Sequence, residues 1–121
     1  MAVKTILTVD DSLIVHQILE SIMKAADGYE IVGHALDGVQ AIKLYAELRP
    51  DIVLLDIIMP EKDGLETLAE LLEHDADAKV IIASSYGTVD AVEQALEIGA
   101  KGFLQKPFEP DALLRLLDEK A

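Results

Sequence analysis

The sequence alternates between short apolar runs and longer segments in which apolar residues recur at helical spacing. Five runs rich in β-branched residues come in order along the chain: TILTV at 5–9, EIVGHA at 30–35, DIVLLD at 51–56, KVIIAS at 79–84 and GFLQK at 102–106. Runs of this length and composition predict strands. Strands that alternate with helices form a mostly parallel sheet covered by helices on both faces. The pattern therefore predicts an α/β protein with a doubly wound, five-stranded sheet and five helices.

The segments between these runs predict the helices, because their apolar residues lie three or four positions apart. We interpret these apolar stripes as core. They are Ile14, Ile18 and Ile22 in the first helix, Ala41, Ile42, Tyr45 and Leu48 in the second, Leu65, Leu68, Ala69 and Leu72 in the third, Val89, Val92 and Leu96 in the fourth, and Leu113, Leu116 and Leu117 in the fifth.

The chain has the size of one domain. Its 121 residues are 51% hydrophobic, which provides enough apolar material for a core, and we expect a single domain over residues 1–121. The sequence contains no cysteine, which excludes disulfides, thiolate metal sites and cysteine catalysis. Stability must therefore come from packing.

The chain is strongly acidic, with a formal net charge of −13 and a pI of about 4.4. This charge opposes direct binding to nucleic acid or to an anionic membrane, and cations or basic protein surfaces suit it better. No apolar run is long enough for a membrane span, and the first residues lack the cleavage site of a secretory signal. We expect a cytoplasmic protein.

Polar residues follow several of the predicted strands. Asp10 and Asp11 follow the first strand, Asp56 ends the third, Ser84 the fourth and Lys106 the fifth. In a doubly wound sheet of order 2-1-3-4-5, strands one and three are neighbours, and ligands bind at the carboxyl ends of the strands where the order reverses. We therefore expect the three carboxylates to converge there.

Three clustered carboxylates repel one another, and a hard divalent cation relieves that repulsion. Oxygen ligands favour Mg²⁺ or Mn²⁺, and Mg²⁺ leaves room for phosphate oxygens. Lys106 suits phosphate oxygens as a point charge, Ser84 is a hydrogen-bond donor, and Asp56 has the chemistry of a nucleophile that forms an acyl phosphate. Each residue alone also fits a plainer role at a strand end or helix cap. Together they indicate a phosphoryl site.

The motifs VDDS at 9–12, LLDIIMPEKDG at 54–64, ASSYG at 83–87 and GAKGFLQKPF at 99–108 resemble the receiver domain of bacterial and archaeal two-component response regulators. The resemblance covers essentially the whole chain, and the motifs are specific as a set. It implies a flavodoxin-like fold and a signalling switch that modifies only itself, not an enzyme that turns over a substrate.

The resemblance also implies roles for single residues. Asp56 matches the phosphoacceptor, Asp10 and Asp11 the acidic metal-binding pair, and the backbone carbonyl of Ile58 the remaining protein ligand to Mg²⁺. These roles imply a transfer in which Asp56 takes a phosphoryl group from a phosphohistidine.

Three further positions match the switch machinery of the family. Ser84 corresponds to the switch hydroxyl, Phe103 to the switch aromatic and Lys106 to the invariant lysine, whose bond to Pro107 is usually cis in the family. Movement of Ser84 and Phe103 is expected to remodel the surface of the fourth helix, fifth strand and fifth helix.

The implied partners are a sensor histidine kinase or a histidine phosphotransfer protein, and a downstream protein target. The stretches 28–53 and 84–87 resemble chemotaxis-type single-domain members, which implies a flagellar motor switch or a kinase as the target. A stand-alone regulator, a receiver fragment and a phosphorelay intermediate all remain open.

Two positions depart from faster members of the family, and a third departs from many chemotaxis-type members. Ile58 and Tyr86 stand where an amide or carboxylate helps to orient the attacking water, so we expect slow self-dephosphorylation. His16 stands where many chemotaxis-type members carry arginine, and we expect it to be a satisfied surface histidine and not a ligand.

Two other functions compete with this interpretation. A metal-dependent phosphohydrolase of the haloacid dehalogenase type also uses a strand-end aspartate, but it needs a second acid where Ile58 stands. A flavodoxin-like carrier of a nucleotide or flavin needs a phosphate-binding loop after the first strand, where this chain has two acids.

Overall fold

Strands and helices alternate along the whole chain, as the sequence pattern predicts. The computed structural model describes residues 3–57, 64–84, 89–106 and 109–120. The elements in chain order are β1 Lys4–Val9, α1 Leu13–Ala25, β2 Tyr29–Ala35, α2 Gly38–Leu48, β3 Ile52–Leu55, α3 Gly64–His74, β4 Val80–Ser84, α4 Val89–Ile98, β5 Gly102–Gln105 and α5 Pro110–Lys120.

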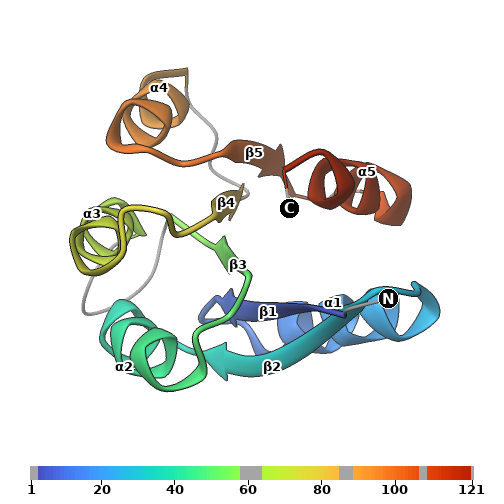
Figure 1. Ribbon diagram of the computed structural model, residues 1–121. Coiled ribbons are helices and arrows are strands. Elements are labelled where there is room, and N and C mark those ends of the chain that lie inside the picture. The colour runs from blue at the N-terminus through green and yellow to red at the C-terminus, as the bar shows by residue number, and fades with distance from the viewer. Residues whose placement is uncertain (1–2, 58–63, 85–88, 107–108, 121) are drawn as a thin grey trace.

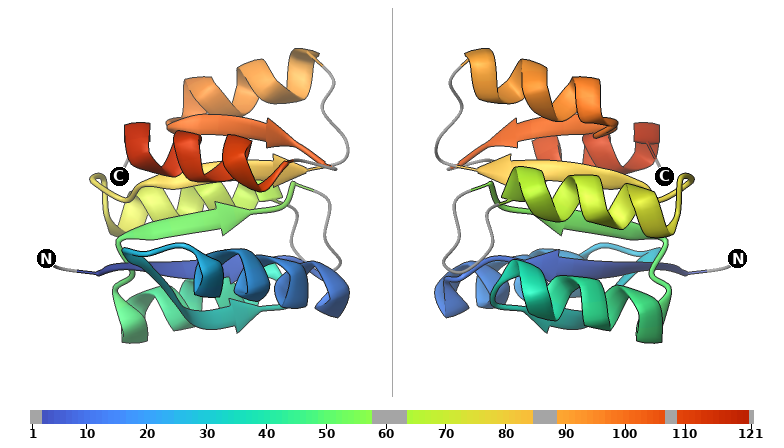
Figure 2. Two further views of the ribbon diagram at one scale, coloured as in Figure 1. Left: turned by 90° about the vertical axis from the view of Figure 1, so that its right-hand side faces the viewer. Right: turned by 90° about the vertical axis from the view of Figure 1, so that its left-hand side faces the viewer.

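The strands form one parallel sheet of order β2-β1-β3-β4-β5, which confirms the predicted fold class and strand order. Helices α1 and α5 cover one face of the sheet, and α2, α3 and α4 cover the other (Figure 1). In side view all strands point the same way, so their carboxyl ends share one edge (Figure 2). β1 and β3 are adjacent at the place where the strand order reverses.

Each face of the sheet has its own apolar core, because alternate strand residues point to opposite faces. Ile6 and Leu54 belong to the core under α1 and α5, whereas Leu7 and Leu55 belong to the core under α2, α3 and α4. The same alternation places Asp10, which follows Ile6 in its row, and Asp56, which follows Leu54, toward the side of α1 and α5 at the carboxyl edge of the sheet. These residues are polar.

The prediction for the apolar stripe of α1 was wrong for Ile14 and Ile18, whereas Ile22 packs against the core under α1 and α5 as predicted. Ile14 and Ile18 are 69% and 51% exposed, whereas His16, Leu19 and Met23 are buried. The helix is rotated from the predicted face because its contact face is fixed by Leu19 and Met23, which pack in the core with α5, and by a hydrogen bond from His16.

The remaining stripes are confirmed in large part. Ala41, Tyr45, Leu68, Leu113 and Leu117 are buried core residues. Two residues of the predicted stripes are exposed instead of buried, because smaller or neighbouring side chains take the place in the core. Leu96 in α4 is 48% exposed while Ala95 beside it is buried, and Leu48 at the end of α2 is 38% exposed. The side chain of Val89 lies outside the described residues.

None of the helices in the described ranges has both the length and the apolar character needed to cross a membrane.

Tyr45 ties α2 to the loop after α3 at the edge of the sheet opposite the polar strand ends. Its ring is 5% exposed, and its hydroxyl donates a hydrogen bond of 2.8 Å to Oδ2 of Asp75. We expect Tyr45→Phe to lower the free energy of unfolding by about 1 kcal/mol at neutral pH, the usual contribution of such a bond. Urea denaturation of the two proteins measures the difference.

The same bond predicts a pH dependence. The hydrogen bond from Tyr45 lowers the pKa of Asp75 below its ordinary value of 3.8, so the folded state favours the ionised carboxylate. A lowered pKa stabilises the fold above the unfolded-state pKa, and this stabilisation disappears as pH falls through the folded-state pKa. The difference between wild type and Tyr45→Phe should therefore narrow when unfolding is repeated below pH 3.8. A constant difference would contradict the assignment.

Candidate functional site

The polar residues at the strand ends are held in place by backbone hydrogen bonds that extend the sheet beyond its last paired residues. The amide of Asp56 donates to the carbonyl of Val9 at 2.9 Å, and the amide of Asp10 donates to the carbonyl of Ala35 at 3.0 Å. The amide of Lys106 donates to the carbonyl of Ser84 at 3.0 Å. The backbone therefore fixes where these side chains start, and the site is built on rigid elements.

The three carboxylates predicted to converge do so. Asp10, Asp11 and Asp56 each offer an oxygen within 4.8 Å of the others. Asp10 and Asp56 are 4% and 9% exposed, and Asp11 is exposed. A set of oxygen donors with an exposed member fits a hard divalent cation that keeps part of its water shell, as Mg²⁺ and Mn²⁺ do. The donor chemistry thus matches the predicted metal.

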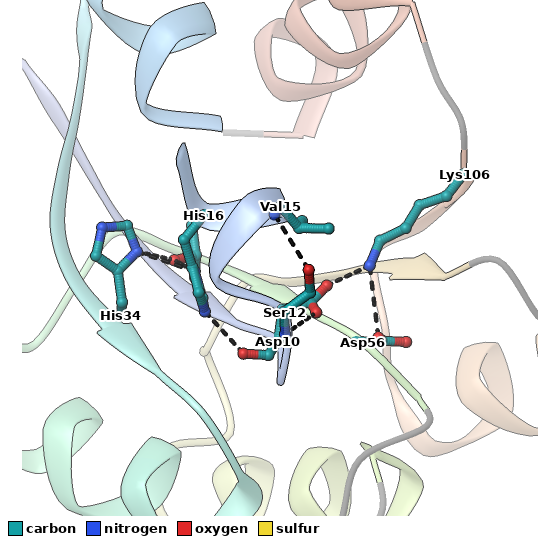
Figure 3. A network of polar contacts seen from close by, with 8 residues as sticks. Asp10, Ser12, Val15, His16, His34, Asp56 and Lys106 are labelled. Carbon is teal, nitrogen blue, oxygen red and sulfur yellow. Dashed lines mark hydrogen bonds and ion pairs between the residues drawn. The ribbon is translucent and has the colours of Figure 1, made fainter. Parts of the chain in front are cut away.

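Lys106 reaches this cluster from the end of β5 (Figure 3). Its ammonium contacts Oδ2 of Asp10 and lies 3.4 Å from Oδ2 of Asp56. The Lys106 side chain is only 16% exposed, so water screens these ion pairs less than it screens surface pairs. Among the described residues, the site holds three carboxylates and one ammonium, and this shortfall of positive charge favours a further cation.

The start of α1 orients Asp10. The amide of Ser12 donates to Oδ1 of Asp10 at 2.9 Å, while Oγ of Ser12 accepts a hydrogen bond from the amide of Val15 and caps the helix. Asp10 therefore has one oxygen held by the backbone and the other by Lys106. Ser12 was not singled out from the sequence, either as a helix cap or as a contact of Asp10.

Ser84 and Phe103 lie on neighbouring strands next to the cluster. Ser84 is fully buried at the end of β4, and its backbone partner in β5 is Gln105. Phe103 is half-buried and packs against the core under α2, α3 and α4. Alternation from Ile82, a member of that core, places Ser84 on the same face of the sheet. The two residues predicted as a switch pair therefore share one face.

Three sequence predictions fall outside the described residues. These are the backbone carbonyl of Ile58, the side chain of Tyr86 and the bond from Lys106 to Pro107.

His16 is not at the surface as predicted, because it is 3% exposed. Its Nε2 donates to the main-chain carbonyl of Asp10 at 2.7 Å, and its Nδ1 lies 2.7 Å from Oγ1 of Thr8. Burial lowers the pKa of the His16 imidazole, and the hydrogen bond to Asp10 acts in the opposite direction. Thr8 and His34, which complete this cluster, were missed because no motif of the sequence links positions on three separate elements.

The sequence profile described as the response regulator receiver domain matches residues 6–118. A chemotaxis protein CheY of Listeria monocytogenes is 44% identical over 116 residues, which cover 96% of this chain and 97% of the relative. A chemotaxis protein CheY of Thermotoga maritima is 40% identical over 116 residues, which cover 96% of each protein.

Solved structures agree. A CheX–CheY–BeF₃–Mg²⁺ complex from Borrelia burgdorferi contains a chain that matches with a TM-score of 0.92 and 35% identity, over 96% of this chain and 87% of that one. Chemotaxis protein CheY4 of Vibrio cholerae matches with a TM-score of 0.90 and 27% identity, over 99% of this chain and 100% of that one.

Proposed function

The chain belongs to the response regulator receiver domain family, and we propose that it is a phosphoacceptor switch in which Asp56 accepts a phosphoryl group from the phosphohistidine of a sensor histidine kinase or a histidine phosphotransfer protein. The observation that carries this proposal is the position of Lys106. Its ammonium lies between the carboxylates of Asp10 and Asp56, within the carboxylate cluster that Asp11 completes.

The transfer is a displacement at phosphorus. A carboxylate oxygen of Asp56 attacks, the bond between phosphorus and the histidine nitrogen breaks, and the imidazole leaves with its electron pair and takes up a proton. Asp10, Asp11 and Asp56, with the carbonyl of Ile58, would hold Mg²⁺, which would neutralise the charge that develops during the transfer. Lys106 is placed to move from the carboxylates onto the incoming phosphoryl oxygens.

Phosphorylation of Asp56 changes the hydrogen-bonding needs of the neighbouring strand end. Ser84 donates its hydroxyl to a phosphoryl oxygen, and the half-buried Phe103 on the same face turns into the space that this movement opens. The two movements remodel the surface formed by α4, β5 and α5, which binds a downstream protein. The switch shifts an existing equilibrium between two conformations.

The domain acts as a chemotaxis-type regulator, and the flagellar motor switch is the downstream target that we propose. This proposal is supported by the extent of the match to chemotaxis proteins CheY, which covers 97% of the Listeria protein and 96% of the Thermotoga protein. Slow self-dephosphorylation follows from the side chains of Ile58 and Tyr86.

Intact mass spectrometry after incubation with acetyl phosphate tests the proposal. The protein is expected to gain one phosphoryl group in the presence of Mg²⁺ and not in its absence, and hydroxylamine is expected to remove the group as it does from acyl phosphates. No gain with Mg²⁺ bound would contradict the proposal. Continuous release of phosphate from small esters would favour a phosphohydrolase instead.

Lys106→Met separates the two roles of the lysine. Removal of its ammonium takes a positive charge from the carboxylates, so Mg²⁺ should bind about tenfold more tightly. Phosphorylation by acetyl phosphate should nevertheless slow about a hundredfold, because the transferring phosphoryl group loses a fixed charge. Calorimetric titration with Mg²⁺ and the rate of mass gain measure the two effects.

Lys101→Met is the matched control, because Lys101 is an exposed lysine that directly precedes β5. It should change neither quantity. If Lys106→Met weakened Mg²⁺ binding, the lysine would support the carboxylate cluster and would not compete with the metal ion.

A further inference from the structure

A second polar cluster lies behind the phosphorylation site, on the side of α1 and β2 (Figure 3). It consists of Thr8 on β1, His16 on α1 and His34 on β2, and we call it the histidine pair with Thr8. Nδ1 of His16 and Nδ1 of His34 are 3.0 Å apart, and they lie 2.7 Å and 2.6 Å from Oγ1 of Thr8. The ring centroids are 4.5 Å apart. Three electron-pair donor atoms therefore meet at one point.

The outer nitrogens of the two rings decide where the ring protons are. Nε2 of His16 lies 2.7 Å from the main-chain carbonyl of Asp10, and a carbonyl only accepts, so this nitrogen carries the proton. Nε2 of His34 lies 3.5 Å from Oε1 of Glu20, and an ionised carboxylate also only accepts. With both rings neutral and the proton of each on Nε2, the two Nδ1 atoms present bare lone pairs to each other.

One hydroxyl cannot satisfy this arrangement. Thr8 has a single hydroxyl proton, which two imidazole lone pairs and the carbonyl of Gly33 at 3.4 Å share as acceptors. At least one pair of lone pairs therefore faces another at hydrogen-bond distance. A centre that accepts electron pairs relieves this opposition, and two imidazoles with a hydroxyl are a ligand set for a metal ion.

We propose that Thr8, His16 and His34 form a binding site for an imidazole-preferring divalent transition metal ion of the zinc class, separate from the carboxylate cluster. Metal–nitrogen bonds of about 2.0–2.1 Å across the observed 3.0 Å between the two nitrogens give an angle of about 95° at the ion, which suits cis ligands. Oγ1 of Thr8 and water complete the coordination.

The surroundings of both rings match those of metal-binding histidines. Such histidines usually donate their other N–H to a carboxylate or to a backbone carbonyl, which fixes the tautomer and the ring orientation. The carbonyl of Asp10 accepts from Nε2 of His16, and the carboxylate of Glu20 lies 3.5 Å from Nε2 of His34 as an ion-pair partner. The His34 and Glu20 side chains are 31% and 50% exposed, so the site has a solvent side through which an ion and water enter.

The two metal sites differ in chemistry. The carboxylate cluster offers only oxygen and suits Mg²⁺, whereas the histidine pair offers nitrogen and suits zinc, nickel or copper ions. They are joined through Asp10, whose side chain belongs to the cluster and whose carbonyl holds His16. An ion on Nδ1 of His16 polarises the ring and strengthens this hydrogen bond, which steadies the backbone of Asp10.

Calorimetric titration with Zn²⁺, with excess Mg²⁺ present to fill the carboxylate cluster, tests the site on the full chain. We expect one Zn²⁺ per chain, with His34→Gln and His16→Gln weakening binding about tenfold or more. The matched control is His74→Gln, because His74 is the remaining histidine of the three in the sequence and is exposed on α3. It should leave the affinity unchanged, and so should Asp11→Asn.

His34→Gln is the deciding variant. His34 lies on an edge strand and is partly exposed, so its substitution is compatible with folding even if that of the buried His16 is not. Imidazole ¹⁵N spectra supply a second readout, in which Zn²⁺ is expected to shift Nδ1 of both residues and not those of His74. Loss of Zn²⁺ binding in Asp11→Asn or His74→Gln, with none in His34→Gln, would overturn the proposal. Spectra that respond to pH but not to Zn²⁺ would also overturn it, because a proton shared by the two Nδ1 atoms would then take the place of the metal ion.

Discussion

Asp56→Asn is expected to abolish the phosphoryl gain that acetyl phosphate and Mg²⁺ give the wild-type protein. An amide at this position cannot form the acyl phosphate, because its oxygen is a far weaker nucleophile than a carboxylate. Asparagine keeps the size of the side chain and its hydrogen bonding to Lys106, so folding should be retained. Intact mass spectrometry gives the result directly, and circular dichroism verifies the fold.

The matched control for this prediction is Asp111→Asn. Asp111 is an exposed aspartate in the first turn of α5, and the same chemical change there should leave the phosphoryl gain intact. A residual gain in Asp56→Asn would mean that another carboxylate accepts the group. Asp11 would then be the first to test, because it is the exposed member of the cluster.

Gly64→Ala is expected to destabilise the protein by about 3 kcal/mol or to displace the residues that follow β3. A methyl group at Gly64 would overlap the main chain of Asp56 and Ile57, including the Ile57 carbonyl at 2.9 Å. The amide of Gly64 also donates a hydrogen bond of 2.6 Å to that carbonyl. The nearest atoms all belong to the main chain, so no flexible side chain can move aside to make room for the methyl group. Alanine itself favours helices, so the cost arises from the contact alone.

Gly102→Ala separates this contact from general effects of adding a methyl group. At Gly102 the new atom would meet only side-chain atoms of Leu116, at 3.2 Å and beyond, and these can move aside. Urea denaturation should therefore show a much smaller loss for Gly102→Ala. Acetyl phosphate labelling should be slower in Gly64→Ala than in Gly102→Ala, because Gly64 packs on the backbone of Asp56, the proposed phosphoacceptor. Equal losses in both assays would refute this role for Gly64.

The candidate phosphorylation site was largely predictable from the sequence. Asp10 and Asp56 each directly follow an apolar run that forms one strand, and the carboxyl ends of parallel strands lie at the same edge of the sheet. Once the order of the strands is given, convergence of these side chains follows from topology. Lys106 lies within reach for the same reason, since it follows β5 directly.

The rotation of α1 was not predictable in the same way. The row of Ile14, Ile18 and Ile22 satisfies the helical period as well as the true contact face does, and periodicity alone cannot choose between two such rows. The choice is made by contacts with distant segments, in which Leu19 and Met23 join a core with α5 and His16 bonds to Asp10. The buried face carries His16 beside the apolar Leu19 and Met23, and Ile14 and Ile18 are left exposed.

The alternation of strands and helices, the single sheet and the carboxylates at the strand ends could all be predicted from the order of residues. These features depend on steric and hydrophobic preferences that act within a few residues along the chain. The buried face of α1, the contacts of Lys106 with Asp10 and Asp56, and the meeting of Thr8, His16 and His34 became known from the folded protein. Those contacts join segments that are far apart in sequence. Their geometry is set by packing over the whole sheet, and a local sequence pattern cannot predict such packing.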